Sequence, residues 1–453
     1  MEKKNTWETY SSKQLKELEK INAQYRDFLD NGKTERECID TIVNTIEKSG
    51  YRELESLIKE GAALKTGDKV YSVWMNKSIA MFQIGRKPMT DGMNILGAHI
   101  DSPRLDVKQN PLYEDGGFAY LDTHYYGGVK KYQWVTIPLA IHGVIVKKDG
   151  TCVEINIGEN EDDPVFFVSD LLIHLAQEQM EKKAAKVIEG EALDIIVGNK
   201  PLLIDKKDKK KDEKEAGKEA VKAGVLDILK ETYDIHEEDF VSAELEIVPA
   251  GKAREAGFDR SMTLAYGQDD RVCAYTSMQA MLDSDVTDRT MCCILVDKEE
   301  IGSVGATGMQ SHFFENAVAE VMNLAGEYSE LNVRRCLAHS CMLSSDVSSA
   351  FDPTYASSFD KKNVAYLGGG MVINKFTGAR GKSGSNDANA EYLAHLRHIF
   401  DKAEVNFQTA ELGKVDLGGG GTIAYILALY GMNVIDSGVA VLNMHAPWEA
   451  TSK

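Results

Sequence analysis

The sequence predicts an α/β fold, in which a mostly parallel sheet is flanked by helices and a β-rich domain is inserted into it. After residue 262, short apolar runs alternate with helical patterns, as in sheets whose parallel strands are joined by helices. Between residues 105 and 248, strand-like runs follow one another with Gly and Asp turns. At 453 residues the chain is too long for one ordinary core. We therefore expect two domains, residues 1–104 with 249–453 and residues 105–248.

The composition is that of a globular, acidic protein. Hydrophobic residues make up 43% of the chain, enough to form buried cores, and the formal net charge is −19. Because nucleic acids and anionic membranes repel an acidic surface, neither is expected as a partner. The seven cysteines are scattered without a Cys-x-x-Cys pair, and neither an apolar signal core nor a membrane-spanning run is expected. These features predict a cytoplasmic protein with reduced thiols.

The first hundred residues predict helices and then strands. Residues 12–59 carry apolar side chains at helical spacing amid charged ones, which predicts helices. Runs 69–74 and 78–84 predict a hairpin pair. The short apolar run 93–98 predicts a buried strand that delivers His99 at its carboxyl end.

The middle of the chain has a different pattern. The mixed-charge tract 206–222 predicts an exposed helix or a loose insertion, with a basic partner-binding tail as the alternative. Residues 169–182 are predicted to form a helix. Predicted strands cover 118–121, 135–146, 152–157 and 240–249.

The remainder of the chain predicts alternating helices and strands. The predicted helices are 271–282, 313–325 and 388–403. The predicted strands are 292–296, the end of 335–343, and 438–443.

Four motifs that contain acids or histidine lie beside apolar runs, where strands are expected to end. Two imidazoles and several carboxylates without a cysteine cluster suit a pair of divalent metal ions that activate water, so the motifs predict a hydrolase. They are Gly97-Ala-His-Ile-Asp101, Gly267-Gln-Asp-Asp-Arg271, Val296-Asp-Lys-Glu-Glu300-Ile-Gly302 and Asn443-Met-His445.

Each of the first two motifs also has an ordinary structural interpretation. His99 can bind a metal while Asp101 orients its ring, or the two residues belong to a polar turn. Asp269 can bridge two metals through its two oxygens, with Asp270 and Arg271 as support. Alternatively, Asp269 caps the helix that follows.

Glu299 and Glu300 follow an apolar run directly. Adjacent side chains diverge, so one carboxylate can bind a metal while the other acts as a general base with a pKa raised by burial. The alternative is a solvated pair on a loop.

Asp346 and His445 also come just after apolar runs. Either can be a metal ligand, but Asp346 can instead cap a turn, and a lone histidine at a strand end is more often structural. The glycine run 418–421 precedes a predicted helix and can hold an anion, such as a carboxylate, on its N–H groups. It lacks the lysine of nucleotide-binding loops.

Taken together, these motifs resemble the aspartyl aminopeptidase (M18) family of metallo-aminopeptidases, one of the two-metal α/β peptidase groups. The resemblance covers nearly the whole chain in motif order. It is clearest in Gly-Ala-His-Ile-Asp-Ser-Pro-Arg, Asp-Lys-Glu-Glu-Ile-Gly-Ser and Met-His. It implies an enzyme that hydrolyses the N-terminal residue from peptides. It also implies two divalent ions per subunit, with Zn expected and Co or Mn as alternatives.

The resemblance also implies a role for each motif residue. Glu299 would be the general base, and Asp101 would orient His99. The metal ligands would be His99 and Asp346 for one ion, Glu300 and His445 for the other, and Asp269 bridging both.

In the family, the inserted domain is a β-rich dimerisation domain, and the assembly is a large homo-oligomer, typically a dodecamer. A histidine of this domain reaches a neighbouring subunit's site and helps to polarise the substrate carbonyl. His174, in Leu172-Ile-His174-Leu, is the matching candidate here. The alternative is an ordinary histidine on a helix surface.

A preference for Asp or Glu at the N-terminus of the substrate would need cations in the specificity pocket. Lys375, Arg380 and Lys382 are the candidates, and a flexible basic loop is the alternative. This stretch departs from the pattern of eukaryotic acidic-specific members, so a broader preference stays open.

Two other classes of function compete with this interpretation. A non-catalytic assembly or cargo scaffold would be expected to lack one or more ligand residues, and all five are present. A deacylase or carboxypeptidase of the same two-metal group would recognise a substrate carboxylate instead of a free amine.

Overall fold

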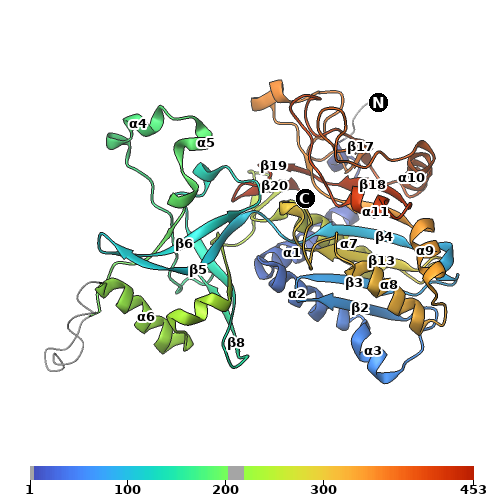
Figure 1. Cartoon of the computed structure of the whole chain (residues 1–453). Helices are drawn as coiled ribbons and strands as arrows, with labels where there is room; N and C mark the ends of the chain where they lie inside the picture. The colour runs from blue at the N-terminus through green and yellow to red at the C-terminus, as the bar shows by residue number, and fades with distance from the viewer. Residues whose placement is uncertain (1–4, 203–218) are drawn as a thin grey trace. The chain divides into compact units, whose positions relative to one another are not determined.

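The computed structural model describes residues 5–202 and 219–453, which divide into two units (Figure 1). Unit 1 comprises the described part of Met1–Ser102 together with Ala253–Met444 and Trp448–Lys453. Unit 2 comprises the described part of Pro103–Lys252 and the short segment His445–Pro447. Most of the predicted charged tract 206–222 lies outside the described residues.

A mixed sheet of nine strands, counted over the described part of the chain, forms the framework of unit 1. Its four central strands run parallel, so their carboxyl ends lie along the same edge of the sheet. They are β13 (Met291–Val296), β4 (Asn94–His99), β14 (Cys341–Ser345) and β18 (Asn433–Gly438). The outer strands are β1 (Arg52–Glu53), β2 (Lys69–Trp74) and β3 (Ser78–Gln83) on one side, and β16 (Met371–Asn374) and β17 (Phe407–Thr409) on the other.

This sheet separates two apolar cores, because successive side chains of a strand point to opposite faces. In β13, Cys292 and Ile294 belong to one core, and Cys293 and Leu295 to the other. The first core is covered by α3 (Leu54–Glu60), α8 (Phe313–Leu324), α9 (Glu330–His339) and α11 (Ala424–Ala428). The second is covered by α1 (Ser12–Asn31), α2 (Glu35–Glu47) and α7 (Gln268–Asp283). The predicted α/β fold is therefore confirmed.

The first two helices begin at caps that the sequence supplies. Ser11 and Gln14 form a capping box before α1, and Thr34 and Glu37 form another before α2. Further along the chain, α10 (Ala390–Lys402) packs its apolar side chains against β16 and β18.

A second, smaller sheet of unit 1 contains the strand that precedes His445. It joins β11 (Arg254–Ala256), β12 (Met262–Ala265), β20 (Glu449–Ser452), β19 (Ala440–Leu442) and β15 (Ser348–Ser349). The strand predicted over 438–443 corresponds to β19, which is shorter and belongs to this smaller sheet, whereas β18, which ends at Gly438, was not predicted. The chain changes sheets at Gly438, where a Cβ would lie only 1.9 Å from the carbonyl oxygen of Asp346.

Unit 2 is built on an antiparallel sheet of six strands within its described residues. Their order is β8 (Cys152–Ile157), β7 (Leu139–Val146), β10 (Ala243–Pro249), β5 (Arg104–Asp115), β6 (Phe118–Tyr126) and β9 (Ile195–Gly198). The helix α6 (Ala220–Tyr233) contacts β5, β6 and β9.

The helix predicted over 169–182 is wrong. Only the short turns η4 (Ile173–Leu175) and α4 (Gln177–Met180) are helical there, with α5 (Ala184–Val187) after them. The apolar side chains of Leu171, Leu172, Ile173 and Leu175 are 47–68% exposed. A helix of this length needs a packed apolar face, and within residues 169–182 Ala176 alone is buried. The described helices also include no segment long and apolar enough to cross a membrane.

Candidate metal centre

Three neighbouring parallel strands of unit 1 deliver carboxylates and an imidazole to one edge of the sheet. His99 is the last residue of β4, and Asp346 follows β14. Glu299 and Glu300 begin the short turn η7 (Glu299–Ile301), just beyond β13. The carboxyl edge of a parallel sheet is where such folds place their reactive groups.

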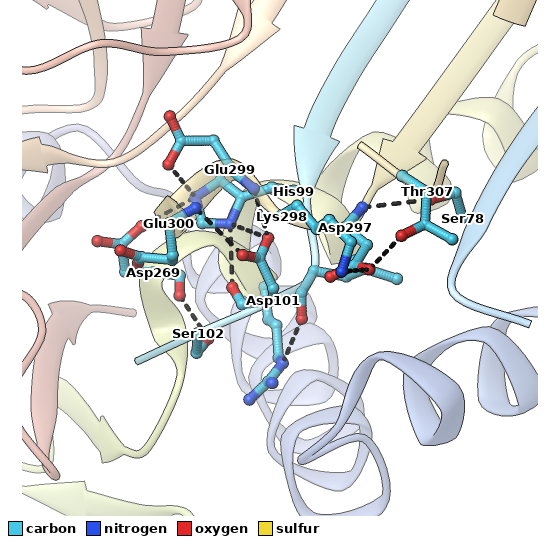
Figure 2. Close-up of polar contacts among 12 residues, drawn as sticks. Ser78, His99, Asp101, Ser102, Asp269, Asp297, Lys298, Glu299, Glu300 and Thr307 are labelled. Carbon is cyan, nitrogen blue, oxygen red and sulfur yellow. Dashed lines mark hydrogen bonds and ion pairs between the residues drawn. The ribbon is translucent and has the colours of Figure 1, made fainter. Parts of the chain in front are cut away.

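The carboxylate of Asp101 joins the β4 and β13 segments (Figure 2). Its Oδ1 lies 3.2 Å from Nδ1 of His99 and accepts the backbone N–H of Glu299 at 3.1 Å. Its Oδ2 accepts the N–H of Glu300, also at 3.1 Å. Since Nδ1 is engaged in this way, Nε2 of His99 faces Asp269, whose Oδ1 lies 3.3 Å away. This is the arrangement in which a carboxylate fixes the orientation of a ligand imidazole.

Hydrogen bonds from both directions hold the backbone of Asp269. Its N–H donates to Oε2 of Glu449 at 3.0 Å, and its carbonyl oxygen accepts the hydroxyl of Ser102 at 2.7 Å. All three residues are buried. The Asp269 carboxylate therefore has a fixed position opposite His99.

Arg271 ties the start of α7 to the loop after β4. Its guanidinium is fully buried and donates to the carbonyl oxygens of Ile100 at 3.2 Å and Lys33 at 2.7 Å. Gly267 makes room for it, because a Cβ there would lie 2.0 Å from the arginine Nη1. The supporting role predicted for Arg271 stays a prediction, and these contacts favour it.

His99, Asp269 and Asp346 form a compact group of potential metal ligands. Each offers one atom, and the three atoms lie within 4.8 Å of one another. Carboxylate oxygens of Asp269 and Glu300 also approach within that distance. One imidazole with several carboxylates is a donor set that suits zinc and other divalent ions.

The electrostatics of this group fit a bound cation. Burial, reinforced by the negative charges of Asp270 and Glu299, raises the pKa of Asp346 well above its usual value. Burial likewise raises the pKa of Asp270. Burial alone would lower the pKa of His99, but its bonds to Asp101 and Asp269 outweigh this and hold the pKa well above normal. Protons thus compensate the crowded negative charge, and a divalent cation would replace them.

Sequence reasoning missed the buried acid that anchors the Glu299 segment. The carboxylate of Asp297 accepts the hydroxyl of Thr307 and lies 3.3 Å from Nζ of Lys298, and its backbone N–H donates to Oγ of Ser78 (Figure 2). Burial and the charges of Glu35 and Asp101 raise the pKa of Asp297 to about 6. The signal in the sequence was that Asp297 directly follows the wholly apolar run of β13.

Two further buried acids were also missed. Glu449 holds the backbone of Asp269, and Asp436 accepts the hydroxyl of Thr422 at 2.5 Å. Burial raises the pKa of Asp436 to about 7, although the bond from Thr422 lowers it. For Asp436 the signal was an acid within the apolar run of β18.

Two of the three predicted substrate-pocket cations, Lys375 and Lys382, contact Asp387. Nζ of Lys375 lies 3.1 Å and Nζ of Lys382 lies 3.0 Å from its carboxylate. Arg380 and Lys382 line a cavity of about 220 Å³ together with Lys414. In the nearby glycine run, Gly418 and Gly420 donate their N–H groups to the carbonyl oxygens of Lys414 and Thr377. Those two groups are thus already used within the protein, which counts against the predicted anion cradle.

The remaining two site candidates belong to unit 2. Nδ1 of His445 lies 2.9 Å from the carbonyl oxygen of Gly128, so the backbone engages that ring nitrogen. His174 lies in the turn η4, with its side chain exposed among exposed apolar neighbours.

Comparison with known proteins covers the whole chain. The sequence model of a family described as aminopeptidase I zinc metalloprotease (M18) matches residues 28–453. A probable M18 family aminopeptidase 1 from Clostridium acetobutylicum is 63% identical over 452 residues, which cover 100% of this chain and 95% of the relative. The crystal structure of an M18 aminopeptidase from Thermotoga maritima has a TM-score of 0.92 at 44% identity, covering 100% of this chain and 96% of that one. The mApe1 dodecamer of S. cerevisiae shares the fold, with a TM-score of 0.75 at 20% identity and coverage of 96% and 93%.

Proposed function

This chain belongs to the M18 family of aminopeptidases, which are zinc metalloproteases and hydrolases, and on that premise we propose the chemistry of its site. The family and the enzyme class expected from the sequence are thereby confirmed. We propose that two divalent ions per subunit act with Glu299 as general base to hydrolyse the N-terminal residue from peptides. The observation that carries this proposal is the compact group of His99, Asp269 and Asp346, with Glu300 beside it.

We assign His99 and Asp346 to one ion, Glu300 and His445 to the other, and Asp269 to both. The close approach of the unit 1 donor atoms supports the first ion and the bridge. Chain connectivity supports His445: it follows Met444 of unit 1 by one peptide bond, and the chain returns to unit 1 at Trp448. Zinc is the family's metal, and Co or Mn would suit the same donors.

When bound, the ions would polarise the scissile carbonyl and lower the pKa of the attacking water. Glu299 accepts the proton of that water and passes it to the leaving amine. Its Oε2 lies 3.9 Å from Nε2 of His99, beside the ligand group. Its backbone N–H donates to Asp101, which also orients His99, so one carboxylate positions both the base and a ligand.

For specificity, we propose that Lys375, Arg380 and Lys382 favour Asp or Glu at the N-terminus of the substrate. Lys375 and Lys382 share the carboxylate of Asp387, and Arg380 lines a cavity with Lys382, Lys414 and Glu411, so the basic side chains outnumber the acidic ones. Asp387 also neutralises part of that charge, so the preference is one of degree, and a broader preference is the alternative.

We propose that unit 1 is the catalytic domain and that unit 2 is a dimerisation domain of a large homo-oligomer. The exposed apolar side chains of Leu171, Leu172, Ile173 and Leu175 support this, because such patches mark interfaces. The same-fold mApe1 of S. cerevisiae is a dodecamer, and we take that state as the expected one. His174, within the patch, would then reach a neighbouring subunit's site. The seven cysteines are all free thiols, which supports a cytoplasmic location.

A comparison of substrates before and after chelation tests the proposed function. We expect hydrolysis of unblocked aminoacyl-anilides, loss of that activity after chelation, and recovery when Zn, Co or Mn is added back. Cleavage of N-acyl amino acids alone would instead indicate a deacylase or carboxypeptidase. A metal-loaded protein that hydrolyses neither substrate would indicate a scaffold.

A further inference from the structure

Unit 1 contains a cavity of about 200 Å³ away from the residues of the proposed reaction. Its wall includes five aromatic side chains: Trp7, Tyr10, Tyr25, Tyr275 and Tyr366. The rings of Tyr25 and Tyr275 lie 5.4 Å apart. An apolar protein cavity of about 150 Å³ holds one benzene molecule. This cavity is therefore large enough for a single substituted aromatic ring.

Two residues that line the cavity carry buried polar atoms with no hydrogen-bond partner among the described residues. These atoms are Oγ1 of Thr6 and Nδ2 of Asn22. Asn22 is 4% exposed, and its Oδ1 accepts the hydroxyl of Thr263 at 2.6 Å, which assigns Nδ2 as the unsatisfied donor. An unpaired buried donor costs about 1–3 kcal/mol. A ligand with a hydrogen-bond acceptor would remove that cost.

The charge of the cavity wall points to an uncharged ligand. Among its described lining residues only Lys453 is charged at neutral pH. The ammonium of Lys453 lies 2.6 Å from Glu255 and 2.8 Å from Glu19, so its charge is balanced within the protein. Burial and the charge of Glu449 raise the pKa of Tyr25, which keeps its phenol neutral.

The cavity wall is connected to the candidate metal centre by hydrogen bonds. The hydroxyls of Tyr25 and Thr451, both in the wall, donate to Oε1 of Gln268 at 3.1 and 2.7 Å. Gln268 directly precedes Asp269. A molecule in the cavity therefore touches the side chains that hold the residue next to the proposed bridging ligand.

We propose that this cavity is a regulatory binding site for a small, uncharged aromatic molecule that carries a hydrogen-bond acceptor, such as an aromatic amide. The ring packs against Tyr25 and Tyr275, and the acceptor receives the N–H of Asn22. Occupancy changes turnover through Gln268. This site is independent of how many ions the metal centre holds.

Benzamide is a suitable probe, and its binding to the full-length, metal-loaded protein can be followed by calorimetry. Ile21 lines the cavity and is 38% exposed, so Ile21→Trp would fill the cavity from its rim. Leu15 lies on the same helix, is 36% exposed and is not a lining residue, so Leu15→Trp is the matched control. We expect I21W to weaken benzamide binding about tenfold or more and L15W to leave it within about twofold.

Two further measurements give independent readouts. Asn22→Asp keeps the acceptor for Thr263 and removes the donor, so we expect weaker binding without loss of the fold.

Saturating benzamide should change kcat of the wild type and of L15W but not of I21W. Absence of saturable binding, or equal binding by I21W and L15W, would overturn the site. An unchanged kcat at saturation would overturn its regulatory role. If benzamide bound at the metal centre instead, I21W would leave its affinity unchanged.

Discussion

Oδ1 of Asp101 lies 3.2 Å from Nδ1 of His99, and both oxygens of this carboxylate also accept N–H groups from the Glu299–Glu300 segment. One buried side chain thus sets the orientation of a proposed metal ligand and the position of the proposed base. Metal affinity and proton transfer are expected to depend on it together.

Asp101→Asn tests this double role. Asparagine keeps one oxygen but places an NH₂ group opposite a backbone N–H, so it cannot serve His99 and both glutamate N–H groups at once. We expect both metal affinity and kcat to fall, each about 10- to 100-fold, as for other residues that orient a ligand imidazole. Chelator competition and steady-state kinetics measure the two quantities. The exposed Asp401→Asn is the control, and a D101N enzyme that matches it would refute the role.

Glu299→Gln and Glu300→Gln form a matched pair of neighbours with different expected defects. E299Q should retain its metal yet lose about 10²–10⁴-fold in kcat, because the proton acceptor is removed. E300Q should lose metal from one of the two sites. Metal analysis beside kinetics separates the two effects, and full activity of E299Q would rule out its assignment as the base.

The ionisation of Asp436 is expected to make the stability of the protein depend on pH, and a single substitution can separate this effect from those of other groups. Because burial raises the folded-state pKa to about 7, the folded protein binds this proton more tightly than the unfolded chain does. The bound proton therefore adds at most about 4 kcal/mol to the free energy of unfolding. This stabilisation is fully present below the unfolded-state pKa and is lost as pH rises through 7. Asp436→Asn keeps an acceptor for Thr422 and removes the titration.

We therefore expect Tm of D436N relative to the wild type to increase between pH 5 and pH 8. Thermal unfolding of both metal-loaded proteins over this range measures the difference. A constant difference in Tm would show that Asp436 stays ionised in the folded protein across this range and would contradict the raised pKa.

Arg380→Ala tests the proposed acidic preference. Removing this cation should lower the ratio of kcat/KM for glutamyl- over leucyl-anilide by about tenfold, corresponding to about 1.4 kcal/mol. Arg397, exposed on α10, provides the control Arg397→Ala. A ratio unchanged from the wild type would favour the broader preference.

Local patterns in the sequence predicted the elements that depend on local chemistry. His99, Asp346 and the Glu299–Glu300 pair follow buried apolar strands, so their meeting at one edge of a parallel sheet could be expected. The roles of Glu449 and Asp297 could not, because Glu449 meets Asp269 from 180 residues away and Asp297 depends on the loop at Thr307. The helix predicted over 169–182 needs a core beneath it, whereas Leu171, Leu172, Ile173 and Leu175 are exposed.

The most direct test of the metal assignment is the number of zinc ions per chain, measured by elemental analysis after dialysis, in the wild type and in His99→Ala. We predict two ions in the active wild type and about one in H99A. The single variant Glu300→Gln is also predicted to keep about one ion, because it loses the ion that H99A retains. A fully active wild type with a single ion, or an H99A variant that keeps both, would contradict the dinuclear centre.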